Sequence, residues 1–423
     1  MKTKLTPLEK SWILYDIGNS AFILLVSTIM PIFFESLCAA DGLDGLYLST
    51  WTFMGSISTL IVAFVGPICG TLADCKRCKK PIFLLSMGLG ALGCALLGTA
   101  WSWLSFAIIF VIAKVGYNSA NVFYDAMLPE VASPERMDTI SSLGYAYGYI
   151  GSVIPFILCL VVVLGNELIG ISMGTAMTIA FVLTALWWVG CTLPLLTKYK
   201  QTAFVESKDN PVVATFQQLW KTFLEAKKNK HIFIYLLSFF FFIDGVYTII
   251  EMATAYGTSL GLDSTGMLLA LLWTQIVAFP CAIIFGRLSA KFDTGKLIKL
   301  CILCYTGITL FAVFLMYQWQ FWLLATLVGM FQGGIQALSR SYLGKIVPAE
   351  NSGEYFGLMD ICGKGASFLG LFLVGIISRY TDGMTYHLFG IEMQSQSLAV
   401  ASLVIIFVIG YVLFCKADKL NKK

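Results

Sequence analysis

Charged side chains are scarce in this chain. Asp, Glu, Lys and Arg together make up 12% of its 423 residues, whereas hydrophobic residues make up 58%. Soluble globular proteins carry about twice that charged fraction, so the composition excludes an ordinary soluble domain. Apolar runs of about 20 residues match the ~30 Å hydrocarbon core of a bilayer, and such continuous runs exclude the short alternating strands of a membrane β-barrel. The composition predicts an all-α polytopic membrane protein.

Motifs of several enzyme and metal-site classes are also absent. The chain has no GxxxxGK[ST], HExxH or GxSxG sequence, so we expect no enzyme, no catalytic residues and no cofactor. Histidine occurs only as His231 and His387, near predicted helix ends, which argues against a histidine relay across the membrane. Cys75 and Cys78 form a CxxC pair, but no second pair completes a zinc site, so we expect no metal. No soluble module presents a basic face, so we expect no nucleic-acid partner.

Long apolar segments predict twelve transmembrane helices, because a chain in hydrocarbon must satisfy its backbone hydrogen bonds internally. The predicted helices are 12–37, 48–72, 82–100, 103–127, 139–164, 171–196, 232–258, 266–286, 297–317, 321–346, 355–379 and 397–414.

Basic residues follow the order of the predicted loops. The N-terminus and the even-numbered loops, with the helix ends beside them, carry nearly all Lys and Arg residues. The odd-numbered connections carry only Arg379, at the end of its predicted helix. Cytoplasmic loops are enriched in Lys and Arg, so this pattern places both termini in the cytoplasm. The first 11 residues are short and polar, which argues against a cleavable signal peptide. Compact loops favour a bacterial inner membrane over a vacuole.

The longest polar stretch divides the chain into three predicted parts. These are an N-terminal six-helix half at 1–197, a cytoplasmic linker at 198–230 and a C-terminal six-helix half at 231–423. Within the linker, Asn210 and Pro211 predict a helix start. The apolar spacing that follows predicts an amphipathic helix on the cytoplasmic leaflet, although binding of a partner remains an alternative.

The two halves share a sparse pattern of small and rigid residues. Such repeats, packed around a midplane site, are the architecture of many secondary transporters. Three residues of the first half recur at one constant offset in the second, namely Pro129, Gly144 and Gly151 as Pro348, Gly363 and Gly370.

Polar residues inside the predicted helices are few, and they are costly in a bilayer unless they pair or line a pathway. Their spacing places them on one face of each helix. For any single residue, the alternative is an interhelical hydrogen bond with a structural role only. The predicted substrate-binding or proton-coupling residues are Lys114, Asn118, Asn121, Asp244, Glu251, Gln332, Gln336, Asp360 and Lys364.

Depth in the membrane separates these residues from a second set. At a rise of 1.5 Å per residue, Lys114 and Asp244 lie roughly 16 Å or more from a membrane surface, near the midplane. Uncompensated charge is hard to tolerate there, so these two and Lys364 are the strongest functional candidates. Asp244 and Glu251 are the candidates to carry a proton. The predicted cytoplasmic gate consists of Asp16, Asn19, Asp74, Asp125 and Arg340.

One motif runs from the end of the second predicted helix into the next loop, and it consists of Gly70-Thr-Leu-Ala-Asp74 followed by Lys79 and Lys80. It resembles the signature that the major facilitator superfamily has between its second and third helices. That signature has Gly where Arg77 stands, and Asp at the position of Ala290 in the second half. The resemblance implies twelve helices in two halves, with Asp74 and the basic cluster stabilising one conformation at the cytoplasmic face.

Several narrower motifs occur along the chain. They are Trp12-x-x-Tyr15-Asp16-x-x-Asn19-Ser20-Ala21-Phe22; Val122-Phe123-Tyr124-x-Ala126-x-Leu128-Pro129-Glu130; Gly334-x-Gln336-Ala337-x-Ser339-Arg340-Ser341; and Phe356-Gly357 with Gly363-Lys364. Together they resemble the branch that includes the fungal autophagy-related vacuolar amino-acid effluxers and bacterial relatives. Asp125 stands where that branch more often has Asn, and Lys114 is outside its pattern.

The sequence therefore predicts a major-facilitator-type secondary active transporter that works by alternating access. We expect it to move a small solute, an amino acid or similar metabolite, with coupling to protons or another ion left open. A lipid or amphiphile exporter and a non-transporting membrane sensor remain alternatives. The expected partners are the solute, the coupling ion and membrane lipids, and the expected oligomeric state is a monomer.

Overall fold

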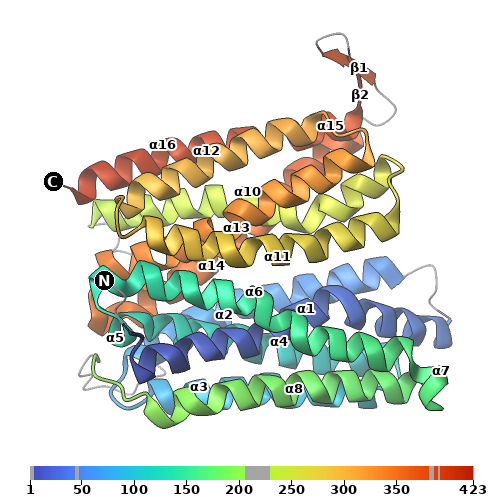
Figure 1. The fold of residues 1–423 in the computed structure, drawn as a ribbon, viewed down its shortest axis with the longest axis horizontal. Helices are drawn as coiled ribbons and strands as arrows, with labels where there is room; N and C mark the ends of the chain where they lie inside the picture. Colours follow the sequence, from blue (N-terminus) through green and yellow to red (C-terminus); the bar gives the residue numbers. More distant parts are fainter. Residues whose placement is uncertain (1–3, 43–46, 205–228, 381–384, 389–390, 423) are drawn as a thin grey trace. The chain divides into compact units, whose positions relative to one another are not determined.

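The computed structural model describes residues 4–42, 47–204, 229–380, 385–388 and 391–422. Within them, twelve long helical segments follow one another along the chain (Figure 1). Short elements connect them: η2 (Leu97–Thr99), α5 (Leu128–Val131), α7 (Asn166–Ile169) and η3 (Ala349–Asn351). The long segments are α1 (Pro7–Ala40), α2 (Tyr47–Asp74), α3 (Lys79–Leu96), α4 (Trp103–Ala126), α6 (Pro134–Leu164), α8 (Met173–Lys198), α10 (Lys230–Ser259), α11 (Ser264–Leu288), α12 (Thr294–Val313), α13 (Gln318–Ile346), α14 (Ser352–Tyr380) and the pair α15 (Ser395–Ala401) and α16 (Leu403–Asn421).

Most of these helices have the length and composition of membrane spans. Among the described residues, ten are long and apolar enough to cross a membrane, and α2 and α14 are the remaining two of the twelve. Each predicted span falls on one of them, so the prediction of an all-α protein with twelve membrane helices is confirmed. The predicted amphipathic helix of the linker lies outside the described residues.

Local sequence signals explain where several helices begin and turn. Thr6 and Glu9 form a capping box at the start of α1, with Glu9 N 3.1 Å from Thr6 Oγ1. Ser102 caps α4 in the same way through Ser105 N. Such caps satisfy backbone N–H groups that have no partner within the helix. Two connections turn through glycines with positive φ, Gly170 and Gly261 at +75° each, a backbone conformation that L side chains disfavour.

The helices cluster into two compact units. Unit 1 contains Met1–Ser133, Tyr147–Leu219 and Pro348–Gly357, and unit 2 contains Pro134–Ala146, Trp220–Val347 and Leu358–Lys423. The first residues of α6 thus cluster with unit 2, and the first residues of α14 cluster with unit 1. The predicted domain boundaries at 197 and 231 stay a prediction.

Unit 1 is held by close packing of α3 and α2 on α4, and of α1 and α3 on α8. Aromatic side chains fill the α1–α4 contact, where the Trp12 and Tyr124 rings stack 4.3 Å apart. Trp12 Nε1 also donates to the Tyr124 carbonyl oxygen at 3.1 Å. Both rings are buried, so this contact supplies apolar burial together with a satisfied indole N–H.

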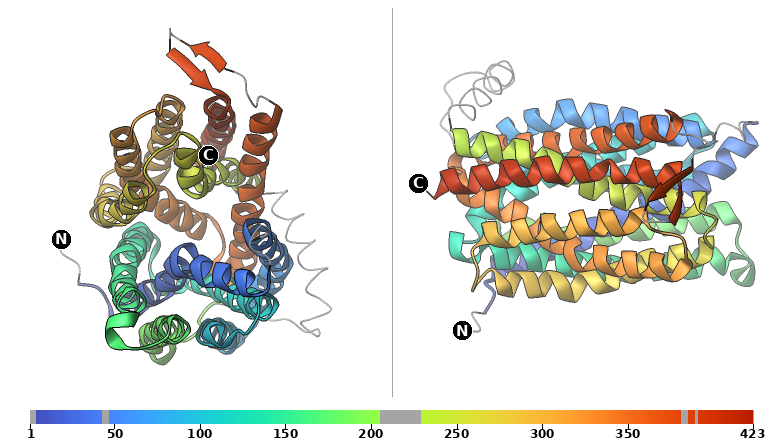
Figure 2. Two further views of the ribbon diagram at one scale, coloured as in Figure 1. Left: turned by 90° about the vertical axis from the view of Figure 1, so that its right-hand side faces the viewer. Right: turned by 90° about the horizontal axis from the view of Figure 1, so that it is seen from above.

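Unit 2 repeats the same packing. Here α12 and α11 pack on α13, and α10 and α12 pack on α16. Counted within each half, the packed pairs are the first with the sixth helix, the second and third with the fourth, and the third with the sixth. This agreement confirms two pseudo-repeated six-helix halves. A short antiparallel hairpin, β1 (Thr385–Leu388) and β2 (Ile391–Gln394), extends beyond the helices of unit 2 (Figures 1 and 2).

Candidate functional site

Asp244 is a fully buried carboxylate in the middle of α10. Its exposed fraction is 0%. Oδ1 accepts a hydrogen bond from the backbone N–H of Gly370 on α14 at 2.9 Å, and the Thr248 hydroxyl lies 3.5 Å away. Oδ2 has no hydrogen-bond partner among the described residues. A buried acceptor without a partner is destabilising, so this oxygen is free to take a proton or a cationic ligand.

The polar row predicted on α4 forms one half-buried face. Lys114, Asn118, Asn121 and Asp125 are all neither fully buried nor fully exposed. The Lys114 ammonium lies 5.6 Å from the centre of the Phe110 ring, a cation–π distance. Asn118 Nδ2 donates to the Lys114 carbonyl oxygen at 2.8 Å, so part of its capacity is used within its own helix.

An amide pair links α1 to α4. Asn19 is 3% exposed, and its Nδ2 donates to Asn121 Oδ1 at 2.8 Å. The Tyr15 hydroxyl donates to the same oxygen at 3.2 Å. The structure thus brings together Asn19 of the predicted gate and Asn121 of the predicted binding site, and it adds Tyr15.

Arg340 on α13 is buried against the first turns of α6. Its Nε lies 2.8 Å from Ser141 Oγ and its Nη2 lies 3.0 Å from the Ser141 carbonyl oxygen. The guanidinium carbon also lies 4.4 Å from the centre of the Tyr145 ring. On the same helix, Gln332 is buried and Gln336 is half-buried. Asp16 is buried on α1, and the predicted gate between Asp16, Asp125 and Arg340 stays a prediction.

Asp74 joins the end of α2 to the start of α14 within unit 1. Its oxygens accept the backbone N–H groups of Gly353 at 2.8 Å and Glu354 at 2.9 Å. A carboxylate is unfavourable at the C-terminal end of its own helix, and favourable at the N-terminal end of another. The approach is close, since a Cβ on Gly70 would lie 2.5 Å from the Gly353 carbonyl oxygen.

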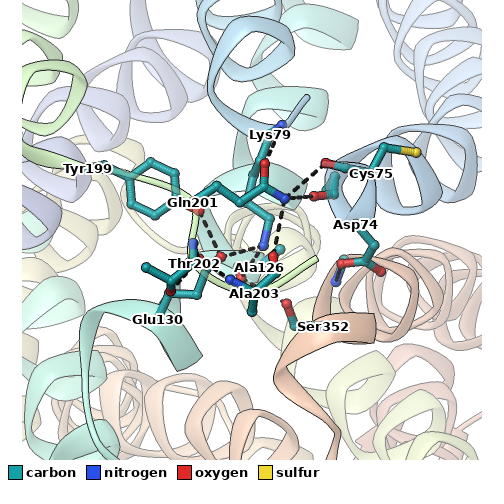
Figure 3. Close-up of polar contacts among 12 residues, drawn as sticks. Asp74, Cys75, Lys79, Ala126, Glu130, Tyr199, Gln201, Thr202, Ala203 and Ser352 are labelled. Atoms are coloured by element: carbon teal, nitrogen blue, oxygen red, sulfur yellow. Dashed lines mark hydrogen bonds and ion pairs between the residues drawn. The ribbon is translucent and has the colours of Figure 1, made fainter. Parts of the chain in front are cut away.

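Beside Asp74, Lys79 and Glu130 form a buried ion pair (Figure 3). Lys79 Nζ lies 2.6 Å from Glu130 Oε1, with the two side chains 0% and 2% exposed. The Tyr199 hydroxyl donates to Oε1 at 2.7 Å. Burial alone would raise the pKa of Glu130, but the Lys79 charge and the hydrogen bonds to the carboxylate outweigh it and lower the pKa. A buried pair with further hydrogen bonds holds both charges in place.

The residues that follow α8 dock on this pair. We call Tyr199–Phe204 the strap. Gln201 Nε2 donates to the carbonyl oxygens of Ala73 at 3.2 Å and Cys75 at 3.0 Å, while its Oε1 lies 3.4 Å from Lys79 N. One amide thus bridges the end of α2 and the start of α3 (Figure 3). The Glu130 carboxylate also accepts N–H groups of the strap, from Thr202 and Ala203. We name Asp74, Lys79, Glu130 and the strap the Asp74 cluster.

A second cluster, in unit 2, surrounds Asp138 on α6. Three side chains donate to this buried carboxylate at 2.6 Å each, namely Thr294, Ser341 and Lys345. Lys345 Nζ also lies 3.0 Å from Thr294 Oγ1. The start of α6 is thereby tied to α12 and α13, and we name these four residues the Asp138 cluster.

Three predicted site residues, Glu251, Asp360 and Lys364, remain to be placed. Glu251 is exposed and Asp360 is half-buried, while the Lys364 side chain lies outside the described residues. A cavity of about 600 Å³ opens between α6 and α8, with apolar lining that includes Leu158, Leu186 and Trp187. It contains none of the predicted site residues. The described part of the chain holds no cluster of metal-ligating side chains.

Comparisons with known proteins show the family to which the chain belongs. Residues 45–418 match the family described as "Vacuole effluxer Atg22 like". The chain belongs to this family. The chain is 38% identical over 419 residues to an uncharacterized MFS-type transporter, YxiO, of Bacillus subtilis (strain 168). The alignment covers 98% of this chain and 95% of the relative. Autophagy-related protein 22 of Kluyveromyces lactis is 22% identical, with 89% of each chain covered.

Solved structures place the fold of this effluxer-like chain in the major facilitator superfamily. The outward conformation of the transporter FucP gives a TM-score of 0.69 at 14% identity, covering 97% of each chain. The human organic anion transporter MFSD10 (TETRAN) gives 0.68 at 14% identity, covering 96% of this chain and 98% of that one. The family match and the MFS-type relative confirm the predicted superfamily and branch. They also confirm the prediction that the protein is a membrane transporter and not an enzyme.

Several residues of the two clusters are not among the site residues predicted from the sequence. Asp138 lies in the second turn of a helix, where acidic residues are common because the N-terminus favours negative charge. Gln201 lies in the polar stretch that was predicted to be the linker at 198–230. Glu130 was named only as part of a family motif. Its position, as an acidic residue soon after an apolar helix, is a signal from which a role at the helix end could have been predicted.

Proposed function

We propose that this protein is a proton-coupled transporter of a small solute, an amino acid or similar metabolite, with its substrate site at the membrane midplane. Alternating access would come from movement of the half at 1–197 relative to the half at 231–423. The observation that carries the proposal is Asp244, a fully buried carboxylate with one oxygen that has no hydrogen-bond partner among the described residues.

The surroundings of Asp244 suit a group that changes its charge. Two donors, Gly370 N–H and the Thr248 hydroxyl, serve only Oδ1. Charging this carboxylate within a bilayer is costly, and a proton or an ammonium group on Oδ2 removes that cost. Binding of an ammonium and binding of a proton would therefore compete for one oxygen, which is one means of coupling.

The half-buried face of α4 supplies the complementary charge in this proposal. Lys114 would attract the carboxylate of an amino acid, with Asn118 and Asn121 on the same face. Gln332, Gln336, Asp360 and Lys364 stay proposed contributors. The family description names an effluxer, which supports a transport role.

The proposed gate uses the loop ends that the structure joins. Asp74 holds the start of α14, and Arg340 holds the start of α6. We propose that these contacts, together with Asp16, Asn19 and Asp125, break when the proposed substrate site opens to the cytoplasm. In this proposal both termini are cytoplasmic, the membrane is a bacterial inner membrane, and the protein acts as a monomer.

Counterflow in proteoliposomes loaded with mixed amino acids, with and without a pH gradient, tests the proposal. We expect saturable exchange that the gradient shifts. Asp244→Asn should abolish the response to the gradient, whereas Glu251→Gln, at an exposed position, should reduce it less. Gradient-dependent transport that survives in Asp244→Asn would refute the role of Asp244. Absence of exchange by folded protein would refute amino acids as substrates.

A further inference from the structure

Two cysteines, Cys75 and Cys78, lie at the two ends of the turn between α2 and α3. The turn is closed by a hydrogen bond from Cys78 N to the Cys75 carbonyl oxygen at 3.2 Å. A turn closed in this way holds the Cα atoms of residues three apart within about 7 Å, a separation that a disulfide can span. Each thiol also donates to a backbone oxygen, Cys75 to Thr71 at 3.7 Å and Cys78 to Lys76 at 3.6 Å. Both side chains are half-buried, so small solutes can reach them.

The turn lies between two anchored residues. Asp74, directly before Cys75, binds the start of α14, and Lys79, directly after Cys78, is buried against Glu130. The Cys75 carbonyl oxygen is held by Gln201. In Figure 3 the Cys75 thiol points away from the Gln201 amide. The sulfur can therefore react without displacing that hydrogen bond.

The chain contains its own control for this pair. Cys301 and Cys304 have the same CxxC spacing, but they lie within the membrane helix α12, and Cys301 is fully buried. Spacing alone therefore does not distinguish the two pairs, whereas access and loop position do.

We propose that Cys75 and Cys78 form a reversible disulfide that serves as a redox switch in the α2–α3 turn. The oxidant is a low-molecular-weight disulfide, such as oxidised glutathione. Disulfides in a reducing compartment are usually transient and redox-sensing.

The reaction is two successive thiol–disulfide exchanges. The Cys78 thiolate attacks one sulfur of the small disulfide, forms a mixed disulfide and releases the first small thiol. The Cys75 thiolate then attacks Cys78 Sγ, forms the internal disulfide and releases the second small thiol. The two protons leave the cysteines and end on the two released thiols. Burial raises the pKa of the Cys75 thiol and lowers its thiolate fraction, which leaves the first attack to Cys78.

The consequence for transport rests on the proposed function. A disulfide removes both S–H donors and requires the two Cβ atoms to lie about 3.8 Å apart. It therefore stiffens the turn that connects Asp74 to Lys79. If breaking the Asp74 contact is part of the transport cycle, oxidation should slow the cycle.

Differential alkylation of the full-length protein tests the chemistry without any transport assay. Reduced protein is equilibrated with oxidised glutathione, free thiols are blocked with N-ethylmaleimide, and reversibly oxidised thiols are then reduced and labelled with iodoacetamide. We expect at least tenfold more of the second label on Cys75 and Cys78 than on Cys301 and Cys304. In Cys75→Ser, a glutathione adduct should persist on Cys78. Failure of Cys75 and Cys78 to oxidise would overturn the proposal.

Proteoliposome transport tests the switch. Oxidation should lower the transport rate of the wild type at least fivefold, and dithiothreitol should restore it. The transport rate of Cys75→Ser should not respond to the oxidant. An unchanged rate in protein shown to carry the disulfide would overturn the switch. A lack of transport in the reduced protein would instead count against the proposed function, and alkylation would still decide the disulfide.

Discussion

In the Asp74 cluster the carboxylate belongs to the end of α2, whereas in the Asp138 cluster it belongs to the start of α6. Asp74 accepts backbone N–H groups from the first turn of α14. Asp138 instead accepts side-chain donors from α12 and α13. The second half has Ala290 where the family signature has Asp, so the carboxylate that corresponds to Asp74 is missing there. The two halves therefore repeat helix packing, while the chemistry that ties their loop ends differs.

The segments after the sixth helix of each half differ in a related way. In unit 1, the uncharged Gln201 joins the end of α2 to the start of α3 through backbone groups. In unit 2, Lys422 at the end of α16 pairs with Asp293, the N-cap of α12, with side chains 46% and 41% exposed. Exposed ion pairs contribute little. Unit 1 should therefore depend more strongly on its clustered loop ends.

The largest expected effect comes from Lys79→Met. It leaves the Glu130 carboxylate buried without its cation, which should reduce the free energy of unfolding by about 3–5 kcal/mol. Thermal unfolding in detergent measures the loss. Lys422→Met, the matched change in unit 2, should cost less than about 1 kcal/mol, because its pair with Asp293 is exposed and its other partner, Asp418, keeps its ion pair with Lys299. Equal losses would contradict the proposed asymmetry.

A pH series provides the control for this pair. The pKa of Glu130 is lowered in the folded protein, so its stabilising contribution is present above the unfolded pKa. It is lost as the pH falls through the folded pKa. Wild type should lose more stability than Glu130→Gln over this acidic range. Parallel curves would show that the ion pair contributes little.

The second comparison pairs Asp74→Ala with Asp138→Ala. Removing Asp74 leaves two buried N–H groups without acceptors and should cost about 1–3 kcal/mol. Removing Asp138 should cost less, about 1 kcal/mol, because the Ser341 hydroxyl also reaches the Leu338 carbonyl oxygen and Lys345 is partly exposed. Unfolding in mixed detergent micelles measures both, and a larger loss for Asp138→Ala would reverse the comparison.

The smallest expected effect is a gain. Arg77 has φ of +63°, the only positive φ outside glycine among the described residues. Here the family signature has Gly, which adopts this conformation without steric cost. Arg77→Gly should therefore stabilise the protein by about 0.5 kcal/mol after the entropy of the unfolded chain is included. Lys76→Gly, the neighbouring control, should destabilise, since Lys76 also lies 4.9 Å from the centre of the Phe204 ring.

The helices could be predicted from sequence because each apolar run and each cap acts over a few residues. Thr6 and Ser102 mark helix starts without knowledge of the fold. Asp244 was predicted in the same way, from its depth in an apolar helix, and it is fully buried; its role stays a prediction.

The loop clusters could not be predicted in this way. Asp138 binds Thr294 and Ser341, each more than 150 positions away, and no periodic pattern records such a pairing. Gln201 has no local feature that separates it from a linker residue. Polar contacts between distant segments depend on tertiary packing, which only the structure supplies.

The strap also determines where the N-terminal half can be cut. A fragment ending at Lys198 would lose Tyr199, Thr202 and Ala203, all of which donate to Glu130, and the Gln201 amide that closes the α2–α3 turn. A fragment ending at Phe204 would keep them all. For split versions of the protein, or for insertion of a reporter between its halves, the useful junction therefore lies after residue 204.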